Sequence, residues 1–439
     1  MNDSDSLADV LPRHPAAQRA LAYFDDLFPE EEEQSVAIPP APPGIDADFL
    51  EQIRQFNGFG TATIGFENEG IPYLVNEFWT AGQRQAHSIH EVSYRACFKP
   101  QLPEFFVSRL TQAGDGVHDP FMGRGTTPLQ AALMGRRPLA NDINPLSILL
   151  TRPRLSPPDL NVMMNRLGTV PWDRPIDVRD ELHAFYHPTT LRHLTVLKEW
   201  LLDEAPLDDS APDPVVDWIR MVAINRLTGH SPGFFSVYTL PPNQAVSIES
   251  QIKINAKRDQ SPPPRDISKL ILKKSRSLLS DGTMISHPRG VLTTGLASHS
   301  PGIPDASAAL VVTSPPFLDI VQYADDNWLR CWFADIDAKG VAIGMHKTEV
   351  AWTEMVRGVL VEQARIVRPG GHVAFEVGEV RGGKVLLERL VWSAAEGLPF
   401  ERLIVMVNQQ EFTKTANCWG VSNNSGGTNT NRIVVLRRT

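Results

Sequence analysis

The nine residues Asp119-Pro-Phe-Met-Gly-Arg-Gly-Thr-Thr127 decide which fold this sequence predicts. A short apolar strand is expected to lead into Asp119, and the apolar spacing after Thr127 predicts a helix that ends near Gly135. Pro128 is tolerated in the first helical turn because its missing N–H would have no partner there. A second strand over 136–143 completes a strand–loop–helix–strand unit, which predicts an α/β fold with a parallel sheet.

The chemistry of this loop favours a cationic ligand. Its two glycines let the backbone pass close to a ligand, but Pro128 occupies the place of the third glycine of a dinucleotide fingerprint. The Asp119 carboxylate would oppose a pyrophosphate, whereas at about 4 Å it favours an ammonium group by roughly 1 to 4 kcal/mol. Asp142, at the end of the second strand, lies near the spacing at which a carboxylate can hydrogen-bond ribose hydroxyls. The alternatives are a tight turn with an incidental Asp119 and a helix cap at Asp142.

The loop resembles the cofactor motif of the amino-group (N4-cytosine and N6-adenine) DNA methyltransferases, which typically reads Asp-Pro-Phe-x-Gly-x-Gly-Thr. The resemblance implies a Rossmann-like S-adenosylmethionine-dependent methyltransferase sheet, mostly parallel with an antiparallel last strand and here with a helical insertion. It also implies S-adenosyl-L-methionine as methyl donor and no metal. The residues it places around the cofactor are Phe98, Asp119, Phe121, Gly123, Gly125, Thr126, Asp142 (on the ribose) and Asn144 (near the adenine).

A second motif is Ser-Pro-Pro, which occurs at Ser156, Ser261 and Ser314. Only the third copy follows an apolar strand, over 309–313, and precedes an aromatic residue. An exocyclic amine is a poor nucleophile because its lone pair is delocalised into the ring. Accepting both N–H hydrogens directs that lone pair toward a methyl group, and Ser314 Oγ with the Pro315 carbonyl can do so. A proline-rich loop after an edge strand is the alternative.

The residues that follow complete this expected catalytic set. Pro316 stiffens the turn, and Phe317 offers a face on which an extruded base can stack, worth about 1 to 3 kcal/mol. The segment 313–317 resembles the catalytic motif of the same family, in which the Ser form is more typical of cytosine-N4 enzymes and Asp or Asn forms of adenine-N6 enzymes. Many Ser-Pro-Pro enzymes carry the two motifs in the opposite order.

The two motifs together predict a site-specific DNA methyltransferase that acts on a flipped base, with cytosine N4 as the target. Double-stranded DNA and a cognate restriction endonuclease are the expected partners, as in a restriction-modification or related defence system. The alternatives are an adenine-N6 DNA methyltransferase, an RNA amino-group methyltransferase, and a non-catalytic DNA-binding protein on a decayed scaffold. Methylation at cytosine C5 is disfavoured because none of the three cysteines follows a proline.

Composition divides the chain into four predicted parts. Residues 1–48 are Pro-rich and hold eleven acidic and two basic side chains, which accounts for the whole net charge of -9. Residues 49–145 contain the cofactor half, 146–289 an insertion between the second and third strands, and 290–439 the catalytic half. The inserted part contains a basic segment, over 251–276, which is the candidate for phosphate contacts in target recognition. The side chains expected to make them are Lys253, Lys257, Arg258, Lys273, Lys274 and Arg276. Ordinary surface lysines on a helical lid are the alternative.

The remaining patterns are those of a globular cytoplasmic enzyme. The apolar fraction is 42%, no apolar run approaches the roughly 20 residues that cross a bilayer, and the start lacks a signal-peptide pattern. Helices are expected over 15–28, 81–96, 103–110, 182–202, 215–227, 325–333, 349–366 and 384–395. Strands are expected over 290–294, 309–313, 372–377, 402–407 and 433–436, with a Gly/Asn-rich loop over 423–431.

Overall fold

The structure is a computed structural model that describes residues 45–80, 86–94, 97–208, 210–239, 245–282, 290–318, 323–341, 346–380, 384–409 and 430–439. A nine-stranded sheet of order β1-β2-β10-β11-β7-β6-β3-β4-β5 forms its centre, and β8 and β9 form a separate pair. The strands are β1 (Ile64–Asn68), β2 (Ile71–Asn76), β3 (Gly116–Asp119), β4 (Arg137–Asp142), β5 (Val291–Thr294), β6 (Ala308–Thr313), β7 (Val367–Val377), β8 (Glu379–Val380), β9 (Val385–Leu386), β10 (Phe400–Gln409) and β11 (Thr430–Arg438).

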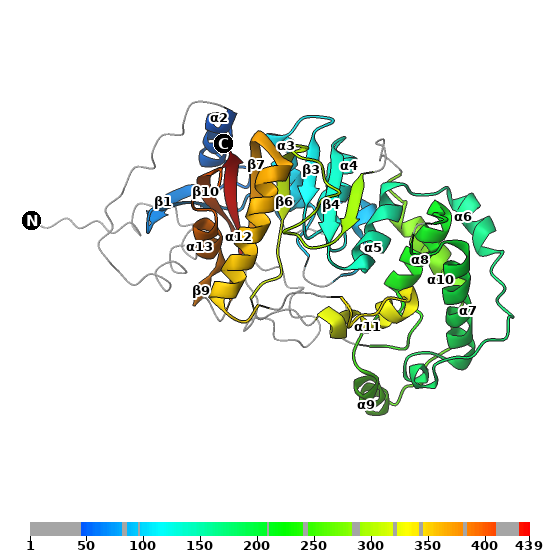
Figure 1. Cartoon of the computed structure of the whole chain (residues 1–439). Helices are drawn as coiled ribbons and strands as arrows, with labels where there is room; N and C mark the ends of the chain where they lie inside the picture. The colour runs from blue at the N-terminus through cyan, green and yellow to red at the C-terminus, as the bar shows by residue number, and fades with distance from the viewer. Residues whose placement is uncertain are drawn as a thin grey trace, which may run out of the picture.

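The strand directions confirm the predicted fold class. Strands β5, β4, β3, β6 and β7 are successive parallel neighbours, and β11, the last strand, lies antiparallel between β7 and β10 (Figure 1). β5 pairs with β4, and helices lie between these two neighbouring strands in the chain. The sequence did not predict the β1–β2 hairpin, which extends the sheet beyond β10.

The helices are α2 (Ile45–Arg54), α3 (Gln101–Leu110), α4 (Thr126–Leu133), α5 (Pro145–Leu155), α6 (Leu160–Leu167), α7 (Pro188–Glu204), α8 (Pro214–Arg226), α9 (Ile248–Arg258), α10 (Ile267–Leu278), α11 (Tyr323–Ala334), α12 (Glu349–Ile366) and α13 (Leu387–Ala394). These helices form two layers, one on each face of the sheet. Side chains alternate along each strand, so neighbouring residues pack against opposite layers. On β11, Val434 packs in the cluster that contains α12 and α13, whereas Ile433 packs in the one that contains α2 and α3. The sheet is therefore buried on both faces, as a parallel sheet requires.

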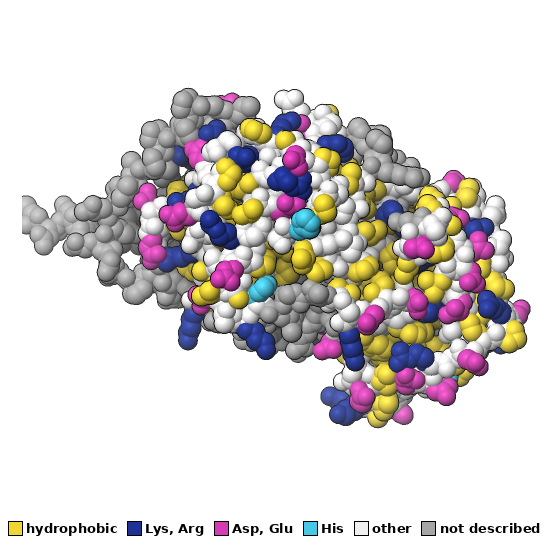
Figure 2. Space-filling model, in the orientation of Figure 1, with side chains coloured by type: hydrophobic (Ala, Val, Ile, Leu, Met, Phe, Trp, Pro, Cys, Tyr) yellow, Lys and Arg dark blue, Asp and Glu magenta, His cyan; other side chains and the backbone are white. Residues whose placement is uncertain are grey.

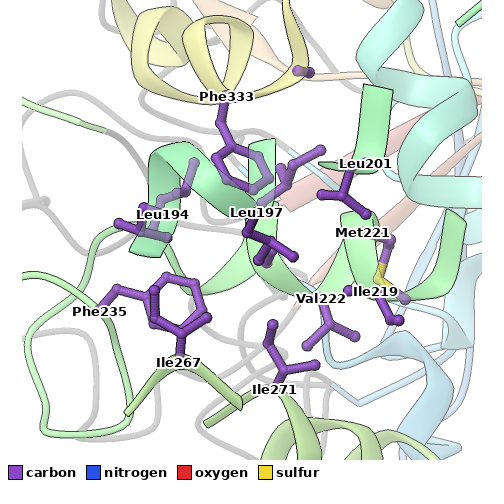
Figure 3. Packing of buried hydrophobic residues seen from close by; sticks show 14 of the residues in the cluster. Leu194, Leu197, Leu201, Ile219, Met221, Val222, Phe235, Ile267, Ile271 and Phe333 are labelled. Carbon is purple, nitrogen blue, oxygen red and sulfur yellow. The ribbon is translucent and has the colours of Figure 1, made fainter. Parts of the chain in front are cut away.

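The inserted helices build a hydrophobic core of their own, on the far side of α5 from the sheet (Figure 1). Leu197 of α7, Ile219 of α8 and Ile271 of α10 lie within it, as Figure 3 shows. Phe333 of α11 enters the same core although α11 follows β6 in the chain. The helices α6 to α11 are called the helical lobe below, and α11 ties this lobe to the segment that leaves β6.

One expected helix is wrong over the residues that can be compared. Within 81–96, residues 86–94 hold only a short 3-10 turn, Ser88–His90. Ser88 N–H donates to Asp281 Oδ2 at 2.8 Å and Ser88 Oγ donates to the Leu278 carbonyl at 2.9 Å. These bonds to the last residue of α10 and to Asp281 beyond it fix the segment in this conformation, so tertiary contacts override its helical spacing.

The other expected helices and strands that fall on described residues are present, with ends shifted by a few residues. The expected helix over 15–28 lies outside the described residues, as does most of the loop over 423–431. α2 begins at Ile45, inside the segment assigned to the acidic tail. Within the described part of the chain, no helix combines the length and the apolar character needed to cross a membrane.

Candidate active site

Two neighbouring parallel strands, β3 and β6, end side by side at one edge of the sheet. His118 pairs with Val311, which places Asp119 next to the end of β6. Thr313 Oγ donates a hydrogen bond of 2.6 Å to Asp119 Oδ1, so the strand ends are in direct contact. Carboxyl ends of parallel strands are where α/β sheets bind ligands. The structure therefore brings the loop 119–127 and the Ser-Pro-Pro-Phe segment, residues 314–317, to one place.

The loop 119–127 is shaped by its two glycines. Gly123 has φ +50° and Gly125 has φ +83°, a conformation that L side chains rarely adopt. A Cβ on Gly125 would lie 2.4 Å from Thr151 Oγ of α5, which is closer than packed atoms approach. A Cβ on Gly123 would meet its nearest neighbour, Tyr94, at an ordinary 3.6 Å. Packing and the positive φ both explain Gly125, whereas at Gly123 the positive φ alone accounts for the glycine.

Asp142, expected on a ribose, holds the loop in place. Its Oδ2 accepts from Gly123 N–H at 2.8 Å and its Oδ1 from Asn144 N–H at 2.9 Å. Asn144 in turn caps α5, since its Oδ1 accepts from Leu146 N–H at 3.0 Å. Both side chains thus fix backbone around the loop, whatever else they bind.

The remaining expected cofactor residues surround the same loop. Arg124 donates to Thr126 Oγ at 3.2 Å and to the Phe98 carbonyl at 3.3 Å, which ties residue 98 to the loop through its backbone. The Phe98 ring packs with the α3 cluster, on one face of the sheet. The Phe121 ring packs with the α12 cluster, against which Phe317 also packs. The structure therefore brings Phe121 and Phe317 to one face and Phe98 to the other.

The site carries negative charge in a buried setting. Asp119 is buried, and burial raises its pKa to about 7, although hydrogen bonds from Thr313 and the Phe121 N–H pull it down. The nearby Asp142 raises it further, and burial also raises the pKa of Asp142 itself. None of the largest influences on Asp119 is a cation. A buried and a half-buried carboxyl of this kind fit a positively charged ligand, which would stabilise their ionised forms. In the described part of the chain, no three His, Cys, Asp or Glu side chains group as metal ligands.

Two residues that the sequence did not single out hold the Ser-Pro-Pro-Phe segment. Trp352, buried on α12, donates from Nε1 to the Pro316 carbonyl at 2.9 Å. Glu376, near the end of β7, lies beside Ser314, because Phe375 pairs with Thr313, and the Ser314 side chain is among the groups that lower its pKa. Pro315 is buried, while Ser314 is half-buried. Nothing in the local sequence marks Trp352 or Glu376, since both reach the segment from neighbouring elements.

Glu376 is the second carboxyl at this edge whose pKa lies near neutrality. It is buried, and burial raises its pKa to about 7 against the lowering effect of hydrogen bonds from Ser314 and Asn431. Asn431 of β11 donates from Nδ2 to Glu376 Oε1 at 2.8 Å. The other Ser-Pro-Pro copies have no such setting: Ser156 ends α5, and Ser261 is exposed between α9 and α10.

The six basic residues expected to contact phosphates lie on two separate helices. Lys253, Lys257 and Arg258 are exposed on α9, and the other three lie on α10. The Arg258 guanidinium lies 3.8 Å from the centre of the Tyr238 ring, and Lys274 pairs with Glu91 at 3.3 Å. On the face drawn in Figure 2, Lys and Arg side chains are interspersed with Asp and Glu. That face presents no continuous basic band.

Comparison with known proteins gives a family match over the first part of the sheet. Residues 65–150 match the sequence model of the N6/N4 methyltransferase family, described as DNA methylase. Type II methyltransferase M.MjaII of Methanocaldococcus jannaschii is 39% identical over 77 residues, which are 18% of this chain and 14% of that relative. The chain therefore aligns with only a small part of this relative's length. The family match contains the loop 119–127 and Asp142, and ends before Ser314.

Solved structures with related folds include TrmN from Thermus thermophilus, at 12% identity, covering 81% of this chain and 53% of that one with a TM-score of 0.32. An S-adenosylmethionine-dependent methyltransferase from Methanosarcina mazei is 9% identical and covers 76% of this chain and 96% of that one, with a TM-score of 0.30. A putative DNA modification methylase, also from Thermus thermophilus, is 23% identical and covers 31% of this chain and 46% of that one, with a TM-score of 0.18.

Proposed function

We propose that this chain methylates an exocyclic amino nitrogen of a DNA base, because residues 65–150 match the model of the N6/N4 methyltransferase family, described as DNA methylase. The observation that carries the proposal is the direct hydrogen bond between Thr313 and Asp119. It joins the end of the family-matched cofactor strand to the strand that leads into Ser314. A methyl donor at the first and an amine at the second would face each other.

The residues around the loop 119–127 fit S-adenosylmethionine. When bound, it supplies an electrophilic methyl group on a cationic sulfonium. The buried Asp119 favours the positive charge of the methionine end, and Asp142 would reach the ribose. At Gly123 even an added Cβ would have its nearest neighbour at 3.6 Å, which leaves room for a ligand to approach the backbone closely. The other residues assigned to this cofactor site are Phe98, Phe121, Thr126 and Asn144.

The Ser-Pro-Pro-Phe segment would hold the target base. Ser314 Oγ and the Pro315 carbonyl accept the two amine hydrogens, which directs the nitrogen lone pair toward the methyl group. Trp352 supports this geometry, because its bond to the Pro316 carbonyl fixes the turn. Phe317 stacks on the base, which must be flipped out because its amine is paired and shielded in a duplex.

We assign cytosine N4 as the target, on the Ser form of the segment, and double-stranded DNA as the substrate. The matched relative is named a Type II methyltransferase, which supports a role as the modification enzyme of a cytoplasmic restriction-modification or related defence system with a cognate endonuclease. The helical lobe, with the basic side chains of α9 and α10, is the proposed target-recognition part.

The test is transfer of labelled methyl groups to genomic DNA by the purified chain, followed by digestion to nucleosides and mass spectrometry. N4-methylcytosine is expected; N6-methyladenine would correct the base, and transfer to RNA alone or to neither nucleic acid would refute the proposal.

A variant pair tests the segment. Ser314→Ala is expected to keep S-adenosylmethionine binding and lose most turnover, because one of the two amine acceptors is gone. Ser261→Ala changes the same tripeptide on an exposed loop and serves as the matched control. Equal turnover in the two variants would exclude Ser314 from the chemistry.

A further inference from the structure

Glu376 occupies a position that the methyl-transfer chemistry described so far leaves unused. It lies next to the strand that leads into Ser314, because Phe375 of β7 pairs with Thr313, the last residue of β6. Its carboxyl is buried and accepts a hydrogen bond of 2.8 Å from Asn431 Nδ2. The strand pairing places it beside Ser314, whose side chain is among the groups that lower its pKa. A buried carboxyl is costly unless polar groups surround it, and one of these neighbours is the hydroxyl at the proposed reaction centre.

A serine hydroxyl has one hydrogen and two lone pairs. To accept an N–H from the target amine, Ser314 Oγ must direct its own hydrogen elsewhere. The Glu376 carboxylate is placed to take that hydrogen, and its negative charge strengthens Oγ as an acceptor, since hydrogen bonds in such chains polarise one another. A protonated Glu376 would instead donate to Oγ and turn the Ser314 hydrogen toward the amine.

We propose that Glu376 is a positioning residue for Ser314 and the final acceptor of the proton that the target amine loses. This inference rests on the proposed amino-methyltransferase function. As the methyl carbon bonds to the amine nitrogen, its bond to sulfur breaks and the electron pair stays on sulfur. The nitrogen, now cationic, loses one N–H proton to Ser314 Oγ while the Ser314 hydroxyl proton passes to the Glu376 carboxylate. Serine ends neutral, and Glu376 ends protonated and later releases its proton to solvent.

The surroundings of Glu376 suit this role. A pKa of about 7 lets the carboxyl be ionised before the reaction and still accept a proton after it. Its polar neighbours, Ser314 just after β6 and Asn431 on β11, are both uncharged. The nearest cation along β11, Arg432, pairs with the buried Glu388 of α13. From β3, Asp119 bonds to Thr313 and not to Glu376.

The first experiment follows single-turnover methyl transfer to DNA against pH for the full chain and for Glu376→Gln. A glutamine amide can still accept the Ser314 hydrogen but cannot take up the proton. We expect the rate of the variant to fall about 100-fold or more, with unchanged S-adenosylmethionine affinity. The additional fall in rate that the wild type should show below about pH 7 should be absent from the variant. Glu362→Gln, a buried glutamate on α12 that bonds Ser300 and Arg365, is the control whose pH profile keeps the wild-type shape. A Glu376→Gln variant with the wild-type rate and pH profile would overturn the proposal.

Two further measurements separate this proposal from its premise and from a folding defect. Titration of carbon-13-labelled glutamate carboxyls by NMR needs no substrate: Glu376 should titrate near neutrality, and at a higher pH in Ser314→Ala. If Ser314→Ala leaves that titration unchanged, the Ser314–Glu376 link is wrong even when the chain methylates DNA. If the link is present but no nucleic acid is methylated, the proposed function fails instead. If Glu376→Gln does not fold, Asn431→Leu is the substitute, because it removes the hydrogen bond from Asn431 to Glu376. Its loss should raise the pH at which the rate falls on the acid side, and an unchanged pH profile would refute the role of Glu376.

Discussion

Replacing Asp119 by Asn should stabilise the chain without ligand and abolish S-adenosylmethionine binding. Asp119 is 1% exposed, and burial holds its pKa at about 7. Folding therefore forces this carboxyl to bind a proton that it would lose at an ordinary pKa of 3.8. Asparagine keeps an oxygen for the bonds from Thr313 and the Phe121 N–H, and it removes the charge that faces Asp142.

The size of the effect follows from the linkage between protonation and folding. A carboxyl with a raised pKa in the folded state is at no disadvantage below the unfolded pKa, and stability falls as the pH rises through the folded pKa. Between about pH 5 and pH 8 the shift of Asp119 costs about 3 kcal/mol, at 1.36 kcal/mol per pH unit. The variant should escape that loss, so its advantage over the wild type should grow with pH.

Thermal unfolding without ligand, measured at pH 5 and pH 8, tests this directly. The melting temperature of Asp119→Asn should exceed that of the wild type by several degrees at the higher pH and by much less at the lower one. Asp217→Asn is a control of opposite sign, because the buried Asp217 pairs with Arg220 at 2.6 Å and with Arg152 at 2.9 Å, and the change removes the carboxylate charge beside the buried Arg220 guanidinium. Destabilisation by Asp119→Asn at both pH values, or unchanged binding of S-adenosylmethionine, would refute the reasoning.

Three further variants test other parts of the site. Gly125→Ala should lower both the melting temperature and the S-adenosylmethionine affinity. Its Cβ would meet Thr151 Oγ at 2.4 Å, and its φ of +83° adds a strain of about 1 to 3 kcal/mol. A calorimetric affinity equal to that of the wild type would contradict this. Trp352→Phe removes the bond to the Pro316 carbonyl and should cost about 1 kcal/mol of stability and lower kcat more than cofactor affinity, which steady-state kinetics would show. Lys257→Ala should weaken DNA binding equally for all sequences and reduce the salt dependence by about one ion, as read from a titration of affinity against salt; an unchanged slope would remove Lys257 from the interface.

The sequence predicts those parts of the fold that short-range patterns encode. The loop 119–127 carries its own signal because glycine positions, a helix start and a strand end fall within a few residues. The helix over 349–366 matches α12 end to end, since its apolar spacing is long and regular. The strand before Ser314 is equally clear as a run of apolar residues.

The rest depends on partners distant in the chain. β2 pairs with β10, which lies more than three hundred residues later, and no residue pattern near Tyr73 predicts this pairing. Glu376 reads as an ordinary polar residue in a strand until β7 is placed beside β6. The turn at Ser88 has helical spacing but follows its bonds to Leu278 and Asp281. In each case the deciding contact appears only when the sheet or the helical lobe has formed.

The sheet order also places the two buried carboxyls, Asp119 and Glu376, on opposite sides of β6. β6 lies between β3 and β7, so Thr313 receives its buried carboxyl, Asp119, from one neighbour, and Ser314 receives Glu376 from the other. If Asp119 acts in cofactor binding and Glu376 in the reaction, acid should affect two steps independently. The value of kcat, measured at saturating S-adenosylmethionine, should fall below about pH 7 with a slope near one in log units, whereas kcat/KM for S-adenosylmethionine should approach a slope of about two. Asp119→Asn should abolish binding, and Glu376→Gln should reduce the second slope to about one. Equal slopes for kcat and kcat/KM in the wild type would show that one carboxyl alone controls both steps.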